Sequence, residues 1–348
     1  MEGFIDTVNS VIWSNWLVYL CLGAGAYFTL ATLFLQIRCF PDMIRQLKSG
    51  ESSDQGISSF QSLMISLAGR VGVGNIAGVA TAIAFGGPGA VFWMWLVALL
   101  GSATSFIECC LAQIYKETDR DTGEYRGGPA YYIEKTYKHT AAKPFMLVYA
   151  IIFAVCMLLA TSYFLPGIQA NGVAAAVDNA WGVNVWISAT IMAIMLAFII
   201  IGGVKRIATF ASMVVPFMAG IYIIIAIVVL FANASQIPEV FGTIVRAAFD
   251  KEAAFSGMLG AAIMWGVKRG IYSNEAGQGT GPQSAAAAEV SHPAKQGFVQ
   301  AFAVYVDTLF VCSATAFIII STDMYKVFEG QSEDGACLLY TSPSPRDL

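Results

Sequence analysis

The chain has 348 residues, of which 57% are hydrophobic and only 12% are charged, and its formal net charge is −4. Soluble domains carry about 25% charged residues, so this composition excludes an ordinary soluble domain and indicates an all-α polytopic membrane protein. The net charge itself is uninformative, because charges in such a protein are sorted by the side of the membrane.

Long runs without Asp, Glu, Lys or Arg predict the membrane spans, since about 20 apolar residues cross the hydrocarbon core. A short amphipathic helix is also expected in the loop 115–143, within "RGGPAYYIEKTY". Eight spans are predicted, roughly at 14–38, 58–84, 89–115, 144–177, 185–204, 207–233, 253–290 and 296–321.

The orientation follows from the Lys and Arg residues, which are concentrated in the segments 38–59, 115–143, 205–206 and 291–297. Cytoplasmic loops carry this excess of basic residues. We therefore predict a multi-pass protein of the inner (plasma) membrane of a prokaryote, with its N-terminus outside.

Two of the predicted spans have a composition that a continuous helix would not choose. The second contains "GRVGVGNIAGVATAIAFGGPG", and the seventh is interrupted at 270–282 by Gly, Pro, Ser, Asn, Glu and Gln. Each predicts two half-helices joined by an unwound segment, which survives at membrane depth only when it is buried or lines a cavity. Broken helices that begin two inverted halves indicate a secondary transporter with its site near the midplane.

Several long segments carry a resemblance to a known family. "GRVGVGNIAGVATAIAFGGPGAVFWMW", "ATSFIECCLAQIYKE", "GEYRGGPAYYIEK" and "KRGIYSNEAGQGTGPQSAAAAEVSHPAKQGFVQ" resemble the alanine or glycine:cation symporter family, and the similarity runs from about residue 14 to 335. The resemblance implies a leucine-transporter-like (LeuT) inverted-repeat fold with one extra N-terminal helix. It also implies uptake of alanine or glycine coupled to sodium ions, or less often to protons, by alternating access.

The expected domain organisation follows from that fold. A transporter domain covers 1–336, with an extra helix at 14–38, a first half at 58–233 and a partial second half at 253–321. The last core helices are missing, and the polar segment 337–348 is expected to be a non-native tail. We therefore expect the 348-residue chain itself to fold poorly and not to transport.

The first unwound segment is predicted to bind the substrate through its backbone. We expect N–H groups around Gly72, Val73, Gly74 and Asn75 to meet a substrate carboxylate at a half-helix N-terminus, where the helix dipole favours an anion. Carbonyl groups nearby would face the cation, so the expected cation ligands include Val71, Gly72 and Asn75. The competing interpretation is close helix packing through the GxxxG pattern.

The second unwound segment and one more span supply further substrate candidates. Ser273 and Asn274 can offer hydroxyl and amide groups, and Gln169 is an amide in an uncharged span, where it either contacts the ligand or hydrogen-bonds another helix. Trp265 is expected either to wall the pocket or simply to pack.

Four charged residues within the spans are predicted to bind a cation or to gate. An acid at the depth of Asp307 is a functional candidate, as a cation ligand or as an ion-pair partner of Arg70 or Lys268. Glu108 is expected to pair with Arg70 in an intracellular gate. Glu275 is expected to be structural or gating, as an ion-pair partner or a helix C-cap.

Other classes of function are less well supported. An ion channel would also have glycine-rich intramembrane segments, but the two broken segments differ in sequence and direction. No HExxH, GxSxG or acid pair in adjacent spans indicates an enzyme. With two His residues and no zinc spacing, no metal centre or cofactor is expected apart from the coupling sodium ion, and the expected partners are the small amino acid and the lipid bilayer, not nucleic acid.

Overall fold

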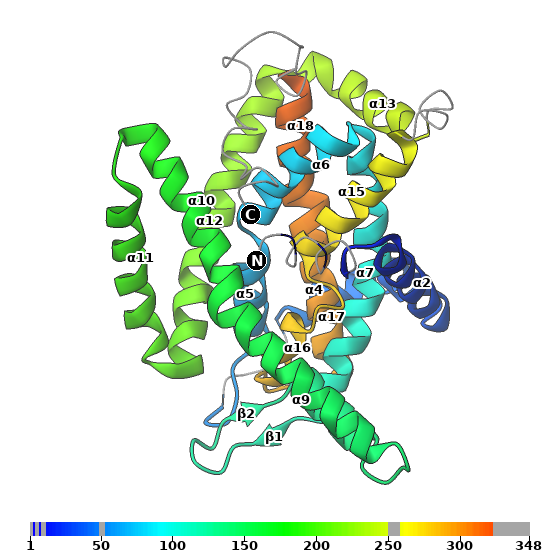
Figure 1. Ribbon diagram of the computed structural model, residues 1–348, viewed down its shortest axis with the longest axis vertical. Helices are drawn as coiled ribbons and strands as arrows, with labels where there is room; N and C mark the ends of the chain where they lie inside the picture. Colours follow the sequence, from blue (N-terminus) through cyan, green and yellow to red (C-terminus); the bar gives the residue numbers. More distant parts are fainter. Residues whose placement is uncertain (1–2, 4–6, 8–11, 49–52, 250–257, 323–348) are drawn as a thin grey trace.

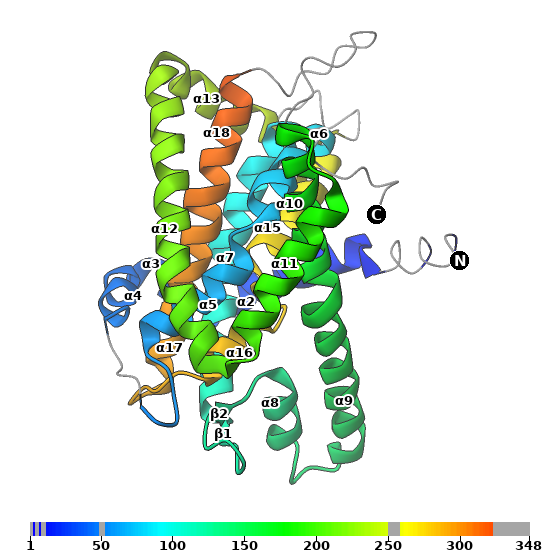
Figure 2. The same cartoon turned by 90° about the vertical axis from the view of Figure 1, so that its left-hand side faces the viewer.

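The computed structural model describes residues 3, 7, 12–48, 53–249 and 258–322, and these are mostly helical (Figure 1, Figure 2). Within those ranges four helices are long and apolar enough to cross a membrane, and one bent pair makes a fifth candidate span. The prediction of a polytopic helical membrane protein is confirmed. The predicted tail at 337–348 lies outside the described residues.

Two predicted spans are shorter in the structure. Helix α2 (Asn15–Ala31) ends before Leu33 and Phe34, whose backbones are left-handed with φ of 54° each. Helix α11 (Val185–Ile200) has 16 residues. Neither reaches the ~20 residues of a straight crossing, so fewer long apolar helices are present than the eight predicted spans. The two short helices that follow α2 are α3 (Leu35–Arg38) and α4 (Phe40–Gln46).

One predicted span is longer than expected. Helix α9 (Lys143–Leu159), the π-helical segment η2 (Ala160–Phe164) and helix α10 (Leu165–Trp181) form one run of 39 residues. Pro166 has no backbone N–H to donate, and the π-helical residues directly before it accommodate the missing bond. In Figure 1 this run crosses the molecule from α10 at the left to α9 at the lower right, and α11 lies at the left edge. The helix after α11 is α12 (Gly203–Ala232).

The first predicted break is confirmed and is shorter than expected. Helix α5 (Ser59–Arg70) starts with a capping box between Ser58 and Gln61 and ends at Arg70. The chain continues as the π-helical segment η1 (Gly74–Gly78) and helix α6 (Val79–Gly86), and the two parts of the span meet at 55°. Only residues 71 and 72 are unwound, because Val73 is already helical and the glycines at 74 and 78 remain in the π-helical turn.

The second break is also confirmed, and it separates α15 (Met258–Asn274) from α16 (Thr280–Ala286). Three residues between them have a left-handed backbone: Glu275 (φ 56°), Gly277 (φ 84°) and Gly279 (φ 89°). Left-handed residues cannot continue a right-handed helix, so α15 ends here.

Helix α7 (Gly89–Ile114) forms the centre of the helical core, where it packs most closely against α15 and α17 (Pro293–Val304). The α15 contact depends on a glycine, because a Cβ atom on Gly266 would lie 2.4 Å from the backbone oxygen of Ala90. The chain after α17 continues through the π-helical segment η4 (Tyr305–Cys312) into α18 (Ser313–Ser321).

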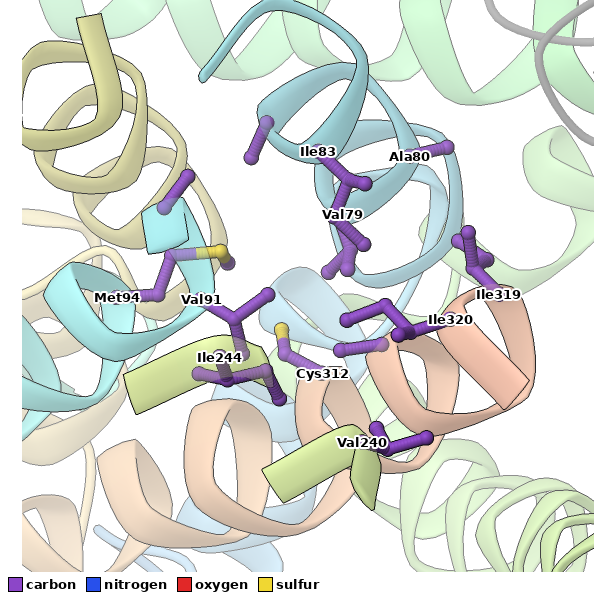
Figure 3. Close-up of a cluster of buried hydrophobic side chains, with 13 residues drawn as sticks. Val79, Ala80, Ile83, Val91, Met94, Val240, Ile244, Cys312, Ile319 and Ile320 are labelled. Atoms are coloured by element: carbon purple, nitrogen blue, oxygen red, sulfur yellow. The ribbon is translucent and has the colours of Figure 1, made fainter. Parts of the chain in front are cut away.

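The sequence analysis missed one amphipathic helix, α13 (Ile237–Ala248), which follows the short turn η3 (Ala234–Gln236). Its buried residues Val240 and Ile244 pack into an apolar cluster shared by α6, α7 and the last span (Figure 3). The largest members of that cluster besides these two are Val79, Ile83, Val91, Met94, Cys312, Ile319 and Ile320.

The loop 115–143 is more ordered than predicted. Its short helix is present as α8 (Pro129–Thr136), in agreement with the sequence analysis. An antiparallel hairpin of β1 (Glu117–Thr118) and β2 (Tyr125–Arg126) precedes it and was not predicted. Figure 2 shows the hairpin and α8 together at one end of the molecule.

The close contact between α7 and α15 generates a stability prediction. Gly266→Ala should lower the free energy of unfolding by about 1–3 kcal/mol, since the new methyl group meets backbone atoms that cannot move freely. Gly260→Ala on the same helix is the control, because a Cβ there meets nothing within 4 Å and alanine is the better helix former. Thermal unfolding of the purified variants in detergent checks both, and equal Tm values would contradict the packing argument.

Candidate functional site

A fully buried carboxylate, that of Asp307 in η4, joins the two broken spans. From the first break, Asn75 Nδ2 donates to Asp307 Oδ1 at 2.6 Å. From the second break, Ser273 Oγ donates to Asp307 Oδ2 at 2.9 Å. The hydroxyl of Thr308 donates to the same Oδ2 at 2.7 Å. One carboxylate therefore receives hydrogen bonds from residues on three different spans.

No Lys, Arg or His of the described residues lies within 4.0 Å of this carboxylate. The two ion-pair partners considered from the sequence are engaged elsewhere. Arg70 donates to the backbone oxygen of Gln300 at 3.3 Å, and the Lys268 Nζ lies 5.9 Å from the ring centroid of Trp13. A buried carboxylate that lacks a basic partner is costly unless it is protonated or binds a cation.

The groups around Asp307 suit a monovalent hard cation better than a transition metal. The carboxylate itself and the hydroxyls of Ser273 and Thr308 supply oxygen atoms, the donors that such cations prefer, whereas the Asn75 amide faces the carboxylate with its nitrogen. Across the described ranges, no cluster of three or more His, Cys, Asp or Glu residues has the geometry to hold a metal ion. Of the predicted cation ligands, the structure brings Asn75 and Asp307 into direct contact. Val71 instead ends α5 by donating its N–H to Leu67 O at 2.8 Å.

The first break presents backbone N–H groups that are satisfied by side-chain amides. The N–H of Gly72 donates to Asn75 Oδ1 at 2.8 Å, and the N–H of Val73 donates to Gln169 Oε1 at 2.9 Å. A Cβ atom at residue 72 would lie 2.6 Å from that same Gln169 oxygen, so only glycine allows this approach. Both N–H groups are therefore paired with side-chain oxygens of the protein itself.

The second break is held by polar side chains on both sides. Asn274 Oδ1 accepts the N–H of Ala276 at 3.0 Å, while its Nδ2 is buried without a partner among the described residues. Glu108, from α7, accepts the N–H of Gly277 on Oε1 at 3.0 Å. Glu108 therefore caps the break, and its carboxylate is not within 4.0 Å of Arg70.

Glu275 ends α15 with a left-handed backbone, which places it at the C-terminal cap position considered from the sequence. Its Oε2 accepts the hydroxyl of Thr280 at 2.6 Å. It makes no ion pair within 4.0 Å with Lys268 or Arg269 in the described part of the chain.

A cavity of about 340 Å³ opens beside the two breaks, between α5, the segment around η2, the end of α15 and α16. The predicted site residues that line it are Gly74 and Gln169 from the substrate set, and Arg70 and Glu275 from the gating set. The cavity thus lies next to the predicted site, on the side of α5 and α16.

Trp265 lies away from this cavity. Its ring stacks on Phe85 with centroids 4.9 Å apart, and the guanidinium of Arg269 lies 5.3 Å from its centroid. Of the two expectations for Trp265, the structure shows aromatic packing between α15 and α6.

Several polar residues of the site were missed by the sequence analysis. Thr308 and Cys312 follow Asp307 in the same span, and Cys312 Sγ lies 3.3 Å from Asn75 Nδ2. Gln300 is fully buried and its carbonyl accepts from both Arg70 and Ser105. The sequence did contain a signal for these residues. The amide of Gln300 and the hydroxyl of Thr308 lie in an otherwise apolar span, and such groups need hydrogen-bond partners when they are buried.

The two half-helices α5 and α16 are joined directly. Ser62 Oγ donates to the backbone oxygen of Ser284 at 2.8 Å, and the hydroxyls of Ser66 and Ser284 lie 2.5 Å apart. Beyond the helices, Ile57 and Ala288 form a parallel β-bridge. The half-helices of the two breaks therefore form one hydrogen-bonded seam.

Comparison with known proteins places these features in a family. Residues 1–343 match the family model described as the sodium:alanine symporter family. The chain is 53% identical, over 98% of its length, to the putative sodium/proton-dependent alanine carrier protein YrbD of Bacillus subtilis (strain 168), covering 68% of that relative.

Two further relatives also match most of the chain. The chain is 47% identical over 93% of its length to the probable sodium/glutamine symporter GlnT of the same organism, and it covers 66% of that protein. It is 41% identical over 97% of its length to the sodium/alanine symporter AgcS of Methanococcus maripaludis, and it covers 74% of that protein. The chain thus spans about two thirds to three quarters of the length of these relatives.

The hydrogen bonds of Asn75 generate a second stability prediction. Asn75→Ala removes the acceptor of the Gly72 N–H and a donor to Asp307, and each unsatisfied buried group costs about 1–3 kcal/mol. The variant should show a clearly lower Tm. Asn171→Ala, at an exposed position on α10, is the matched control and should unfold as the unmodified chain does. An equal decrease of Tm in the two variants would show that the hydrogen bonds around Asp307 do not stabilise the fold.

Proposed function

The chain belongs to the sodium:alanine symporter family, and from this premise we propose that it forms a site for the transport of alanine across the membrane together with a cation. Members of this family are transporters, which confirms that the chain is not an enzyme. Alanine is the proposed substrate because YrbD of Bacillus subtilis, named as a putative sodium/proton-dependent alanine carrier protein, is 53% identical to this chain. Glycine, which is smaller, is proposed as an alternative substrate.

The proposed fold is an inverted repeat of the leucine-transporter type. The first half covers 58–233 and begins with the break after α5, and the part of the second half at 253–321 begins with the break after α15. The extra helix 14–38 precedes both. With the N-terminus outside and the protein in the prokaryotic plasma membrane, α5 and α16 lie on the cytoplasmic side.

The contact of both breaks with one buried carboxylate is the observation that carries this function. In the proposed mechanism, the substrate carboxylate accepts N–H groups of residues 72–75 and displaces the Gln169 oxygen from Val73. Ser273 and Asn274 contact the substrate from the second break. The cation binds beside Asp307 and Asn75, with backbone oxygens of Val71 and Gly72 as further ligands.

The electrostatics give a physical reason for coupling. A sodium ion at Asp307 compensates the buried charge and stabilises the arrangement in which Asn75 and Ser273 converge on it. A substrate carboxylate bound next to that arrangement is then favoured by the cation. By linkage, the cation and alanine raise each other's affinity by the same factor.

Alternating access requires the two sides of the site to open in turn. The cavity beside Arg70 and Glu275 is the proposed cytoplasmic opening, and these residues together with Glu108 are the proposed gate. In this conformation the N–H groups of the first break are satisfied internally, as expected after the substrate has left the midplane.

Binding to the purified chain in lipid nanodiscs tests the proposal without requiring transport. The affinity for radiolabelled alanine should rise about tenfold or more with sodium, and the affinity for sodium should rise with alanine by the same factor. Glycine should compete, whereas phenylalanine should not. Alanine binding that is indifferent to sodium but depends on pH would transfer the coupling role to protons, and no alanine binding at all would overturn the proposal.

The role of Asp307 gives a separate prediction. Asp307→Asn keeps the size of the side chain but removes its charge, so alanine binding should lose its dependence on sodium. Asp178→Asn, at an exposed position on α10, is the control and should keep the full dependence. A sodium dependence that survives in Asp307→Asn would exclude Asp307 as a cation ligand.

A further inference from the structure

Arg70 is a buried cation whose hydrogen bonds are incomplete. Only 2% of the residue is exposed, and its Nη1 donates to the Gln300 carbonyl. Its Nε and Nη2 are buried without a hydrogen-bond partner among the described residues. Unsatisfied donors on a buried charge are costly, and such a group is a strong site for an anion.

Three carboxylates from different elements interact electrostatically with this guanidinium, Glu108 from α7, Glu275 from the second break and Asp307 from η4. None of them lies within 4.0 Å of it in the described structure. Glu108 is directed by its bond to the Gly277 N–H, while Glu275 lines the cavity and receives one hydrogen bond, from Thr280, on Oε2. Arg70 and Glu275 therefore border one cavity with opposite charges that do not neutralise each other by contact.

The cavity has the size and polarity for a small polar solute. Its volume of about 340 Å³ is near the lower end of ligand pockets, which run from about 300 to 1,000 Å³. Hydroxyl and amide groups of Ser66, Thr161 and Gln283 line it besides the two charges. Gly281 also lines it, and a Cβ atom at that position would lie 2.8 Å from Arg70 Nη2. The glycine therefore lets the backbone of α16 pack closely against the guanidinium.

We propose that this cavity is a second position for the transported amino acid, in which Arg70 binds its carboxylate and Glu275 binds its ammonium group. This inference rests on the proposed function and adds a site on the α16 side of the breaks. A zwitterion satisfies both charges at once, whereas an inorganic anion would leave Glu275 without a cation. When the amino acid leaves the first break, its carboxylate loses the backbone N–H groups and binds the Arg70 guanidinium. The negative charge of the carboxylate therefore keeps a partner during release.

The test is a cysteine-protection experiment that reports on the cavity itself. In nanodiscs with saturating sodium, Gln283→Cys is labelled with a polar thiol reagent, and modification at this position is measured by mass spectrometry. Alanine should slow the labelling of Gln283→Cys. It should not slow the labelling of Thr136→Cys, an exposed position on α8 outside the cavity.

The contributions of Arg70 and Glu275 are distinguished with analogues of alanine that lack one of its two charges. Arg70→Gln should raise the alanine concentration for half-protection about tenfold or more, and should leave protection by alaninamide, which has no carboxylate, unchanged. Glu275→Gln should have the same effect on alanine and should leave protection by propionate, which has no ammonium group, unchanged. Gly281→Ala keeps both charges and should weaken protection by alanine, because its methyl group would lie 2.8 Å from Arg70 Nη2 and displace the guanidinium.

The outcomes distinguish this inference from the proposed function. Sodium-dependent alanine binding without protection of Gln283→Cys, or with protection that is insensitive to Arg70→Gln and Gly281→Ala, overturns the second position and leaves the proposed function intact. If the unmodified chain binds no alanine, the proposed function itself has failed.

Discussion

The arrangement of the site depends on one buried carboxylate. Asp307 lies in the last described span, yet its oxygens hold Asn75 of the first break and Ser273 of the second. Such a charge is costly in a low-dielectric interior, and each of its hydrogen bonds offsets part of that cost. Because the donors come from separate spans, satisfying the charge also fixes where the two unwound segments meet.

The sequence predicted the parts of this structure that depend on composition. Apolar runs indicated the long helices, and the clustered glycines with Asn75 and Glu275 indicated both breaks, because such residues are costly inside a continuous helix. The same reasoning selected Asp307. It did not predict the short α2 or the hairpin after α7, since the left-handed backbone at Leu33 and Phe34 and the pairing of β1 with β2 depend on tertiary contacts rather than on local pattern.

Partner choice in the site was the least predictable feature. From the sequence, Arg70 had two possible acidic partners, Asp307 and Glu108. In the structure Glu108 accepts a backbone N–H at the second break instead. A backbone donor freed by a left-handed glycine, Gly277, competes for the carboxylate, and single-sequence reasoning cannot place such a donor before the path of the unwound chain is known.

The seam between α5 and α16 has a consequence for how the protein is made. The hydrogen bond from Ser62 to Ser284 connects positions 222 residues apart. Synthesis proceeds from the N-terminus, so α5 enters the bilayer long before α16 exists, with Ser62, Ser66 and Arg70 on a face that has yet to meet its partner. The polar half-helix α5 therefore lacks these partners until α16 has been synthesised, and the seam between the two breaks can form only after that point.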